Sequence, residues 1–214
     1  MYTPAKYLRQ DVKEMVDCAR EFPFALAVSG SKYATWIPVV VSMDEKEQKP
    51  RFDFHLARAN PHAQALASGN EEDVMLVFLG PHGYISPRWY GDRVRNVPTW
   101  NFVAFHVKGK PKPISDNKQL LAMLNNLVVN NEAKLSGPEW SLKEAQPRYV
   151  ELMSENIIGF TMTCDSFQGK AKLSQDFSDE DRVSMIRELV KSGNERLSKE
   201  MQRSLDDDIK TSKL

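Results

Sequence analysis

The sequence predicts an α+β protein built on an antiparallel β-barrel with peripheral and C-terminal helices. Three observations support this class. The chain offers about six or seven strand-like runs, these runs do not alternate with helices, and the apolar period changes from two residues to about 3.6 after Pro113. Strands followed by helices are typical of α+β folds, whereas strict strand–helix alternation would predict a parallel sheet.

The early part of the chain is predicted to hold one helix and three strands. Apolar residues at helical spacing indicate a helix over residues 11–20, and Pro23 ends it. Apolar and polar residues then alternate, which is the pattern of strands with one buried face. The strands are expected at 24–28, 35–41 and 51–57, with the charged segment 44–50 as a turn.

The middle of the chain is predicted to continue the barrel. A short helical connection is expected over 60–69. The continuous apolar run 73–79 is expected to be a strand buried on both sides. Repeated prolines and glycines predict that 80–98 is mainly loop, with a short extended piece at 84–86, before a further strand over 99–108.

Helices dominate the remaining sequence. Ser115 is expected to cap a helix whose leucines recur at helical spacing. A second helix is predicted over 147–157, and it leads into a strand over 158–165. Ser178 is expected to cap the last helical region, and the charged tail from Asp206 is expected to fray.

Charge and composition narrow the classes of partner. Lysine plus arginine equals aspartate plus glutamate at 29 each, so direct DNA binding is not expected unless a partner protein supplies it. Cys18 and Cys164 are expected to be reduced core thiols, and neither the cysteines nor the four histidines have metal-site spacing. Without a signal peptide or an apolar run of about 20 residues, a cytoplasmic protein that does not enter a membrane is expected.

Three clusters place polar and aromatic residues where a plain barrel needs neither. Residues 55–61 (HLARANP) end a strand with small residues and Arg58, whose planar guanidinium suits a phosphate group. Residues 80–90 hold two prolines and two glycines beside three aromatic residues, which suits a planar heterocycle. At the start of the next strand, Thr99 and Asn101 point the same way and offer a hydroxyl and an amide.

Each cluster also has a purely structural interpretation. The arginine could be a surface residue beside a turn, and the aromatic residues could pin a loop to the core. The third cluster could be a capped strand start. The residues taken cluster by cluster leave both interpretations open.

In this order, the clusters resemble the PaiB family of FMN-binding negative transcriptional regulators. The resemblance begins with MYTP at residues 1–4, runs through HLARANP, PHGYISPRWY and VPTWNF, and reaches Gly169 and the KLSQ segment at 172–175. It therefore covers nearly the whole chain, and the combination of motifs is specific although no single motif is. Phe102 stands where a tyrosine is common and Asp176 where an asparagine is usual, which puts a hydrogen bond from either position in doubt.

The resemblance implies a split barrel related to pyridoxamine-phosphate oxidases and flavin reductases, with an FMN-binding domain over 1–175 and a helical extension over 176–214. Arg58 would hold the FMN phosphate, helped by Lys172. Other residues of the clusters would line the flavin ring or close the site. The implied cofactor-binding residues are His55, Ala57, Arg58, Ala59, Asn60, Tyr84, Ile85, Ser86, Trp89, Thr99, Trp100, Asn101, Lys172 and Gln175.

The resemblance also implies a homodimer with the flavin near the subunit interface. We expect apolar strand faces and the aromatic loop around Trp89 and Tyr90 to be only partly covered within one subunit. Three functions follow, in order of preference: a flavin-binding regulatory protein, a flavin-dependent oxidoreductase using NAD(P)H, and a haem-binding relative on the same barrel. The first of these is not an enzyme, and no catalytic residue is assigned.

Overall fold

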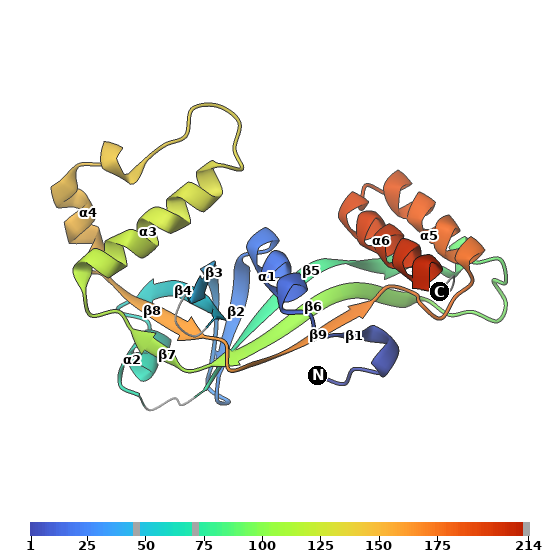
Figure 1. Ribbon diagram of the computed structural model, residues 1–214, viewed down its shortest axis with the longest axis horizontal. Helices are drawn as coiled ribbons and strands as arrows, with labels where there is room; N and C mark the ends of the chain where they lie inside the picture. Colours follow the sequence, from blue (N-terminus) through green and yellow to red (C-terminus); the bar gives the residue numbers. More distant parts are fainter. Residues whose placement is uncertain (45–47, 70–72, 212–214) are drawn as a thin grey trace. The chain divides into compact units, whose positions relative to one another are not determined.

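A computed structural model describes residues 1–44, 48–69 and 73–211, so the middle of the predicted turn over 44–50 lies outside the described residues. The chain forms two compact units, which are taken one at a time. The Lys172 unit comprises residues 1–11, 79–105 and 168–214, and the Arg58 unit comprises residues 12–78 and 106–167. Figure 1 follows the chain through its helices and strands.

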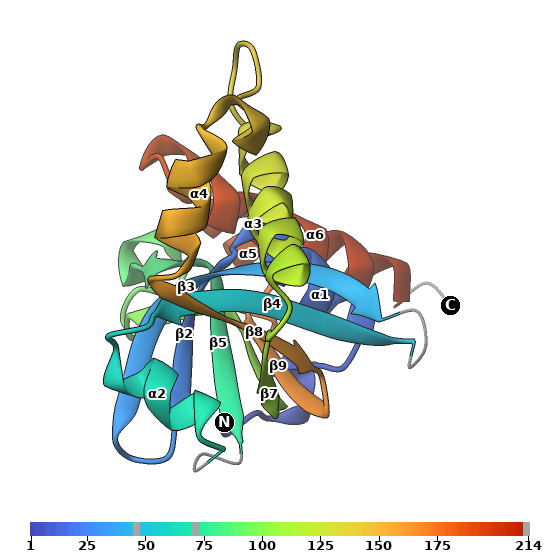
Figure 2. The ribbon, with the colours of Figure 1, turned by 90° about the vertical axis from the view of Figure 1, so that its left-hand side faces the viewer.

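The Arg58 unit is an antiparallel sheet with helices. Its strands follow the order β5-β2-β3-β4-β8-β7, and neighbouring strands pair antiparallel. Figure 2 shows α3 and α4 on one side of β3, β4 and β8. The elements are α1 (Val12–Glu21), β2 (Phe24–Ser29), β3 (Tyr33–Asp44), β4 (Lys49–Ala57), α2 (Pro61–Ala67), the start of β5 (Val74–Ile85), the end of β6 (Thr99–Gly109), β7 (Pro111–Pro113), α3 (Asn117–Glu132), η3 (Leu142–Glu144), α4 (Pro147–Ser154), β8 (Ile157–Thr163) and the start of β9 (Ser166–Lys172).

Aromatic residues fill the core of the Arg58 unit. Phe52 and Phe54 are almost completely buried, as the alternation in β4 predicts. Phe52 contacts Phe78 with ring centroids 5.8 Å apart, and Phe54 stacks on Phe160 at 5.5 Å. Buried aromatic pairs in such offset arrangements add to the stabilisation from the apolar area that they remove from water. The polar residues of β4 consequently face away from this core.

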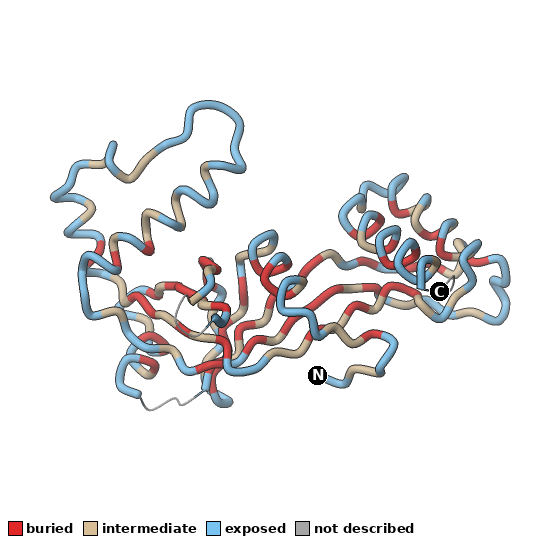
Figure 3. Tube along the Cα trace, viewed as in Figure 1, coloured by how far each residue is buried: buried red, intermediate tan, exposed pale blue. Residues whose placement is uncertain are grey.

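The Lys172 unit pairs its strands in the order β1-β9-β6-β5 and carries two C-terminal helices. Apolar residues on both helices are buried, and Figure 3 shows these buried stretches alternating with exposed turns. Such alternation is the mark of amphipathic helices packed on one face. The elements are η1 (Ala5–Tyr7), β1 (Leu8–Arg9), the end of β5, η2 (Pro87–Trp89), the start of β6, the end of β9, α5 (Asp179–Lys191) and α6 (Glu195–Thr211).

Most predicted elements are confirmed, but β5 differs from the prediction in two ways. The strand continues to Ile85, so residues 80–85 are not loop. Nor is it buried on both sides in the described part. Val74 and Leu76 are buried, whereas Met75 and Val77 have intermediate exposure and Leu79 is exposed. An unbroken apolar run therefore does not show that both faces of a strand are buried, because one apolar face of β5 is accessible.

Several boundaries and one cap also differ. The described residues form nine strands rather than about six or seven, because β1 and β7 are too short to show a period. Asp116, not Ser115, caps α3 by accepting a hydrogen bond from the Lys118 amide. Helix α4 ends at Ser154, and α6 continues through the charged tail to Thr211. The Ser178 cap of α5 is confirmed.

Among the described residues, no helix is both long and apolar enough to cross a membrane. The histidine, cysteine and acidic side chains of these residues do not gather in groups that could hold a metal ion. Cys18 and Cys164 are both buried and form no disulfide, as predicted. Burial raises the pKa of the Cys164 thiol to about 11, which keeps it protonated and poorly nucleophilic at neutral pH.

Candidate functional site

Arg58 lies just beyond the end of β4, and the protein itself holds its guanidinium in place. Nε donates to the carbonyl oxygen of Glu155 at 2.7 Å, and Nη2 donates to that of Ile157 at 2.9 Å. The Arg58 amide also donates to the Asn156 carbonyl at 2.8 Å. These contacts fix one edge of the planar group. The donors of Nη1 make no described hydrogen bond, so they are available to an anion.

A cavity of about 390 Å³ adjoins this arginine. Ser115, Asn117 and Ser154 line it together with Arg58, and Gly159 of β8 is also part of its lining. A Cβ at Gly159 would lie 2.6 Å from Leu120 Cδ1, so any larger residue here would displace the Leu120 side chain of α3. The Ser154 hydroxyl donates to the Glu151 carbonyl at 2.6 Å, so Arg58, Ser115 and Asn117 supply the donors that a phosphate group could use here.

The other predicted residues near Arg58 divide into accessible and structural ones. Ala57 and Ala59 are exposed, so small side chains do flank the arginine. Asn60 uses its side-chain oxygen to cap α2, accepting from the His62 amide at 2.9 Å. The asparagine and proline of the motif therefore have a structural role, because they begin helix α2. Whether Asn60 also contacts a ligand stays a prediction.

His55 is the most informative residue of this group. It lies on β4 opposite Gly159, and its Nδ1 atom is buried without a hydrogen-bond partner in the described part of the chain. Burial lowers the pKa of the imidazole, which keeps it neutral at pH 7. A neutral imidazole nitrogen can donate or accept, depending on its tautomer. An orphaned buried atom of this kind points to a partner from outside the polypeptide.

In the Lys172 unit, two motifs about seventy residues apart come together. Lys172 Nζ donates to the Thr99 hydroxyl. Asn101 Nδ2 donates to Ser174 Oγ at 2.9 Å, and Asn101 Oδ1 is buried without a partner among the described residues. Thr99 and Asn101 thus point the same way, as the alternation of the strand predicts. The KLSQ segment and the VPTWN segment form one local structure.

The KLSQ turn is shaped by its own side chains. Ser174 adopts φ 64°, a left-handed conformation that is uncommon for a residue other than glycine. Gln175 stabilises the turn, because its Oε1 accepts from the Leu173 amide at 2.8 Å and its Nε2 donates to the Ala171 carbonyl at 2.7 Å. The predicted ligand contact of Gln175 stays untested, and its amide is engaged in holding the turn.

Exposed aromatic rings lie beside this turn on β5 and β6. Trp100 and Tyr84 are each about half exposed, at 50% and 48%, with ring centroids 6.4 Å apart. Trp100 also stacks against His82 and donates from Nε1 to His82 Nδ1 at 3.3 Å. Accessible flat surfaces held in fixed positions suit a planar ring system or a protein interface.

The remaining loop residues are more deeply buried than predicted. Tyr90 is only 3% exposed and stacks on Phe177 at 4.7 Å, so the expectation that this part of the aromatic loop is partly uncovered is wrong. Ile85 is buried, and Ser86 caps the short helix η2. Trp89 has intermediate exposure. The loop is pinned to the Lys172 unit by Phe177, which lies far along the sequence.

Residues that the sequence motifs do not include hold these motifs in place. Asn194 donates from Nδ2 to the His82 carbonyl at 3.0 Å, and its Oδ1 accepts from the Leu197 amide at the start of α6. Met201 receives a hydrogen bond from Asn101. Gly193-Asn194 lies between two helical patterns, which could have indicated a helix cap. The contact of Asn194 with β5 could not have been predicted, because no sequence pattern near Asn194 indicates it.

The comparisons with known proteins decide the family. The family described as "Putative FMN-binding domain" matches residues 1–166. The chain belongs to this family. It is 28% identical to the protease synthase and sporulation protein PAI 2 of Bacillus subtilis, over 98% of this chain and 99% of the relative. The resemblance to the PaiB family is thereby confirmed, and so is the predicted flavin cofactor, FMN.

Solved structures confirm the α+β split-barrel class for this FMN-binding family member. One is the FAD and haem binding protein of Mycobacterium smegmatis, with a TM-score of 0.53 and 14% identity over 83% of this chain and 80% of that one. The other is a flavocytochrome of Azotobacter vinelandii, with a TM-score of 0.52 and 17% identity over 83% and 75%. At these identities the likeness concerns the fold alone.

The residues present fit FMN on two counts. Arg58, with Ser115 and Asn117 in the same cavity, offers donors to a phosphate monoester, and the neutral His55 can meet a hydrogen-bonding edge of a flavin ring. Bound FMN would supply one- and two-electron redox chemistry. The chain's own part would be to anchor the phosphate and to orient the ring.

Proposed function

We propose that this protein is an FMN-binding regulatory protein of the PaiB type, which acts as a flavin-dependent sensor in negative control of transcription. The similarity to the Bacillus relative along almost the full length of both chains carries this proposal. That relative is named for protease synthesis and sporulation, which are regulated processes. The similarity extends past the matched FMN-binding family into the region of α5 and α6.

Within this function, Arg58 holds the FMN phosphate and His55 contacts the ring. The two hydrogen bonds to backbone carbonyls orient the guanidinium before a ligand arrives, which lowers the entropy cost of binding. A bound ligand would give the buried Nδ1 of His55 a hydrogen-bond partner. Ligand binding would therefore stabilise the C-terminal end of β4, and a sensor requires such a difference between its free and bound states.

We propose separately that the predicted residues of the Lys172 unit form, within that unit, a surface that can contact a planar ring. Tyr84 and Trp100 offer exposed aromatic faces, and Thr99 with Lys172 offers polar groups beside them. Asn101 and Gln175 hold the KLSQ turn, to which Lys172 of this surface belongs. This division assigns contact to the first four residues and positioning to the last two.

An absorbance spectrum of the purified protein tests the cofactor, and NAD(P)H oxidation tests the class of function. We expect flavin bands that persist through gel filtration. We also expect NAD(P)H oxidation no faster than with FMN alone. Rapid turnover would favour a flavin-dependent oxidoreductase instead. A Soret band would favour a haem-binding protein, an alternative raised by the two structural neighbours whose descriptions include haem or a cytochrome.

We expect no tight, direct DNA binding by this chain alone. The C-terminal helices carry basic residues, but acidic residues one turn away pair with them. Lys191 lies 2.6 Å from Glu188, and Arg203 lies 3.8 Å from Glu200. A zero net charge adds no general attraction to phosphates. A mobility-shift assay at physiological salt checks this, and nanomolar sequence-selective binding without a partner protein would contradict it.

We further propose a homodimer, in which an outward apolar face of the Arg58 unit pairs with its copy. Residues directly opposite on neighbouring strands share a face. Leu26 lies opposite Trp36 on β3 and Val77 on β5, and Phe24 stacks on Trp36 at 5.6 Å. None of the residues of this face is charged, so it is self-complementary under two-fold symmetry. The face consists of Phe24, Leu26, Val28, Ala34, Trp36, Pro38, Met75 and Val77.

We propose a cytoplasmic location on the basis of the two cysteines. Both are buried without a disulfide, and the Cys164 thiol stays protonated because burial raises its pKa. Isolated reduced thiols are typical of proteins in reducing compartments. Fractionation of cells that express the tagged protein checks this proposal.

A further inference from the structure

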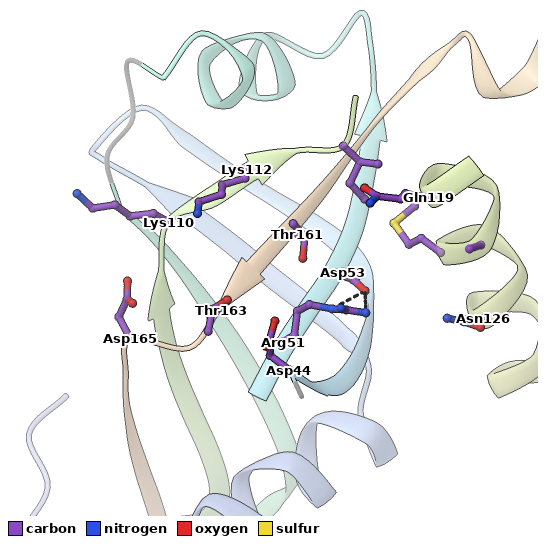
Figure 4. Close-up of a pocket in the computed structure, with 13 residues that line it drawn as sticks. Asp44, Arg51, Asp53, Lys110, Lys112, Gln119, Asn126, Thr161, Thr163 and Asp165 are labelled. Atoms are coloured by element: carbon purple, nitrogen blue, oxygen red, sulfur yellow. Dashed lines mark hydrogen bonds and ion pairs between the residues drawn. The ribbon is translucent and has the colours of Figure 1, made fainter. Parts of the chain in front are cut away.

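The Arg58 unit has a second cavity, and the residues that line it are not those proposed to bind the flavin. It has a volume of about 580 Å³ and lies between the outward face of β4, β8 and β7 and one face of α3. This volume suits a small metabolite. Its lining is mostly polar, and Figure 4 shows these side chains around the cavity. It shares Ile114 with the Arg58 cavity but contains none of the predicted cofactor-binding residues.

The strand register places the polar residues of β4, β8 and β7 opposite one another across neighbouring strands. Thr163 lies opposite Arg51, and Thr161 lies opposite Asp53 on one side and Lys112 on the other. Lys110 precedes Lys112 by two residues. Because directly opposite residues and residues two apart in a strand share a face, these side chains project from the same surface. Three neighbouring strands therefore contribute charges and hydroxyls to one cavity.

Gly109 makes this arrangement sterically feasible. It connects β6 to β7, and a Cβ built on it would collide with the Thr163 carbonyl oxygen and lie 2.8 Å from Met162 Cγ. Only glycine lets the chain pass this close to β8. The close passage brings Lys110 and Lys112 beside the two threonines.

The cations of the cavity differ in how far their charge is already balanced. Arg51 donates from Nε to Asp53 Oδ2 at 3.2 Å, and its Nη2 lies 3.2 Å from the same oxygen. Asp53 is buried, so this pair is shielded from water. Lys110 and Lys112, in contrast, make no side-chain hydrogen bond or ion pair with the described residues. They are the cations available to a ligand.

The donor types select among anions. The planar fork of Arg51, which suits a carboxylate, is occupied by Asp53. What remains are the Nη1 donors of Arg51, two ammonium groups and two hydroxyls, which bind a phosphate as point charges and single donors. Asp44 and Asp165 also line the cavity and disfavour a highly charged ligand. Gln119 and Asn126 of α3 add amides that can bind hydroxyl groups.

We propose that this cavity binds a small phosphate monoester with a hydroxylated body. Lys112, Thr161 and Thr163 hold the phosphate, and Lys110 adds charge at the rim. Gln119 and Asn126 hydrogen-bond the body of the ligand from α3. The site is distinct from the proposed flavin site and does not depend on the flavin proposal.

Isothermal titration with inorganic phosphate and with glycerol phosphate tests this, with glycerol and acetate as comparison ligands. We expect saturable binding of both phosphates, with and without excess FMN, and none of glycerol or acetate at the same concentrations. Lys112→Gln should weaken binding at least about tenfold, because it removes one charge-assisted hydrogen bond. Thr161→Val should weaken it less. Lys118→Gln is the matched control, since Lys118 is an exposed lysine of α3 outside the lining.

Thermal unfolding of each variant checks that the fold is intact. Arg58→Ala tests whether phosphate binds in this cavity or in the one that Arg58 lines. We expect Arg58→Ala to leave phosphate binding unchanged. The proposal is overturned if neither phosphate binds, if FMN abolishes binding, or if acetate binds equally well. It is also overturned if Arg58→Ala or Lys118→Gln weakens binding as much as Lys112→Gln does.

Discussion

Replacing Trp36 by glutamate should convert the proposed dimer to a monomer. Trp36 is 53% exposed and stacks on Phe24, which is 61% exposed, and it lies beside Leu26 of the middle strand of the uncharged face of β3, β2 and β5. A central aromatic residue of an interface contributes about 2 kcal/mol or more. A two-fold interface contains it twice, so the dimer should lose about 4 kcal/mol, or roughly a thousandfold in dissociation constant at 1.4 kcal/mol per decade. Burying the new carboxylate adds to this loss.

Sedimentation at micromolar concentration measures the effect. The wild type should sediment as twice 24.4 kDa and the variant as 24.4 kDa. Tyr149→Glu on α4 is the matched control, because Tyr149 is 59% exposed but lies outside this face. It should leave the dimer unchanged. A wild type that sediments as a monomer, or a Trp36→Glu variant that stays dimeric, would rule out this interface.

Strands with regular alternation could be predicted from the sequence, and those with breakers could not. In β6 the alternation correctly assigns Thr99 and Asn101 to one face, and the structure places both against the KLSQ turn. In β5, Gly83 suggests a loop, yet it lies within a strand. A Cβ there would lie 2.6 Å from Asn194 Nδ2, so a larger residue would displace the side chain that donates to the His82 carbonyl. Packing between residues far apart in sequence leaves no local pattern.

The candidate site shows the same limit. The motifs locate His55 and Arg58 correctly at the end of a strand, because a strand that ends in small residues and an Asn-Pro turn is a local feature. The motifs do not reveal that Glu155 and Ile157 anchor the Arg58 guanidinium through their carbonyls. Nor do they reveal that Tyr90 packs on Phe177. Which motif residues contact a ligand and which position others depends on such distant partners.

Arg58→Ala should weaken FMN about ten- to a hundredfold and leave riboflavin nearly unchanged. The two flavins differ by the phosphate, and a charge-assisted hydrogen bond to it is worth about 1.5–3 kcal/mol, which corresponds to that range at 1.4 kcal/mol per decade. Arg58 is exposed at a strand end, so the fold should survive. Arg58→Lys should recover only part of the affinity, because an ammonium lacks the planar fork and cannot donate to both backbone carbonyls in the same geometry.

Fluorescence titration of both flavins against the wild type and both variants measures these affinities. Arg93→Ala is the control for loss of an exposed arginine, because Arg93 lies in the loop between η2 and β6. Equal binding of FMN and riboflavin to the wild type would refute the phosphate assignment while leaving the flavin site intact. Equal weakening of both flavins by Arg58→Ala would mean that the arginine acts by holding Glu155 and Ile157 in place. Because riboflavin shares the ring and lacks only the phosphate, its affinity separates these two roles of one side chain.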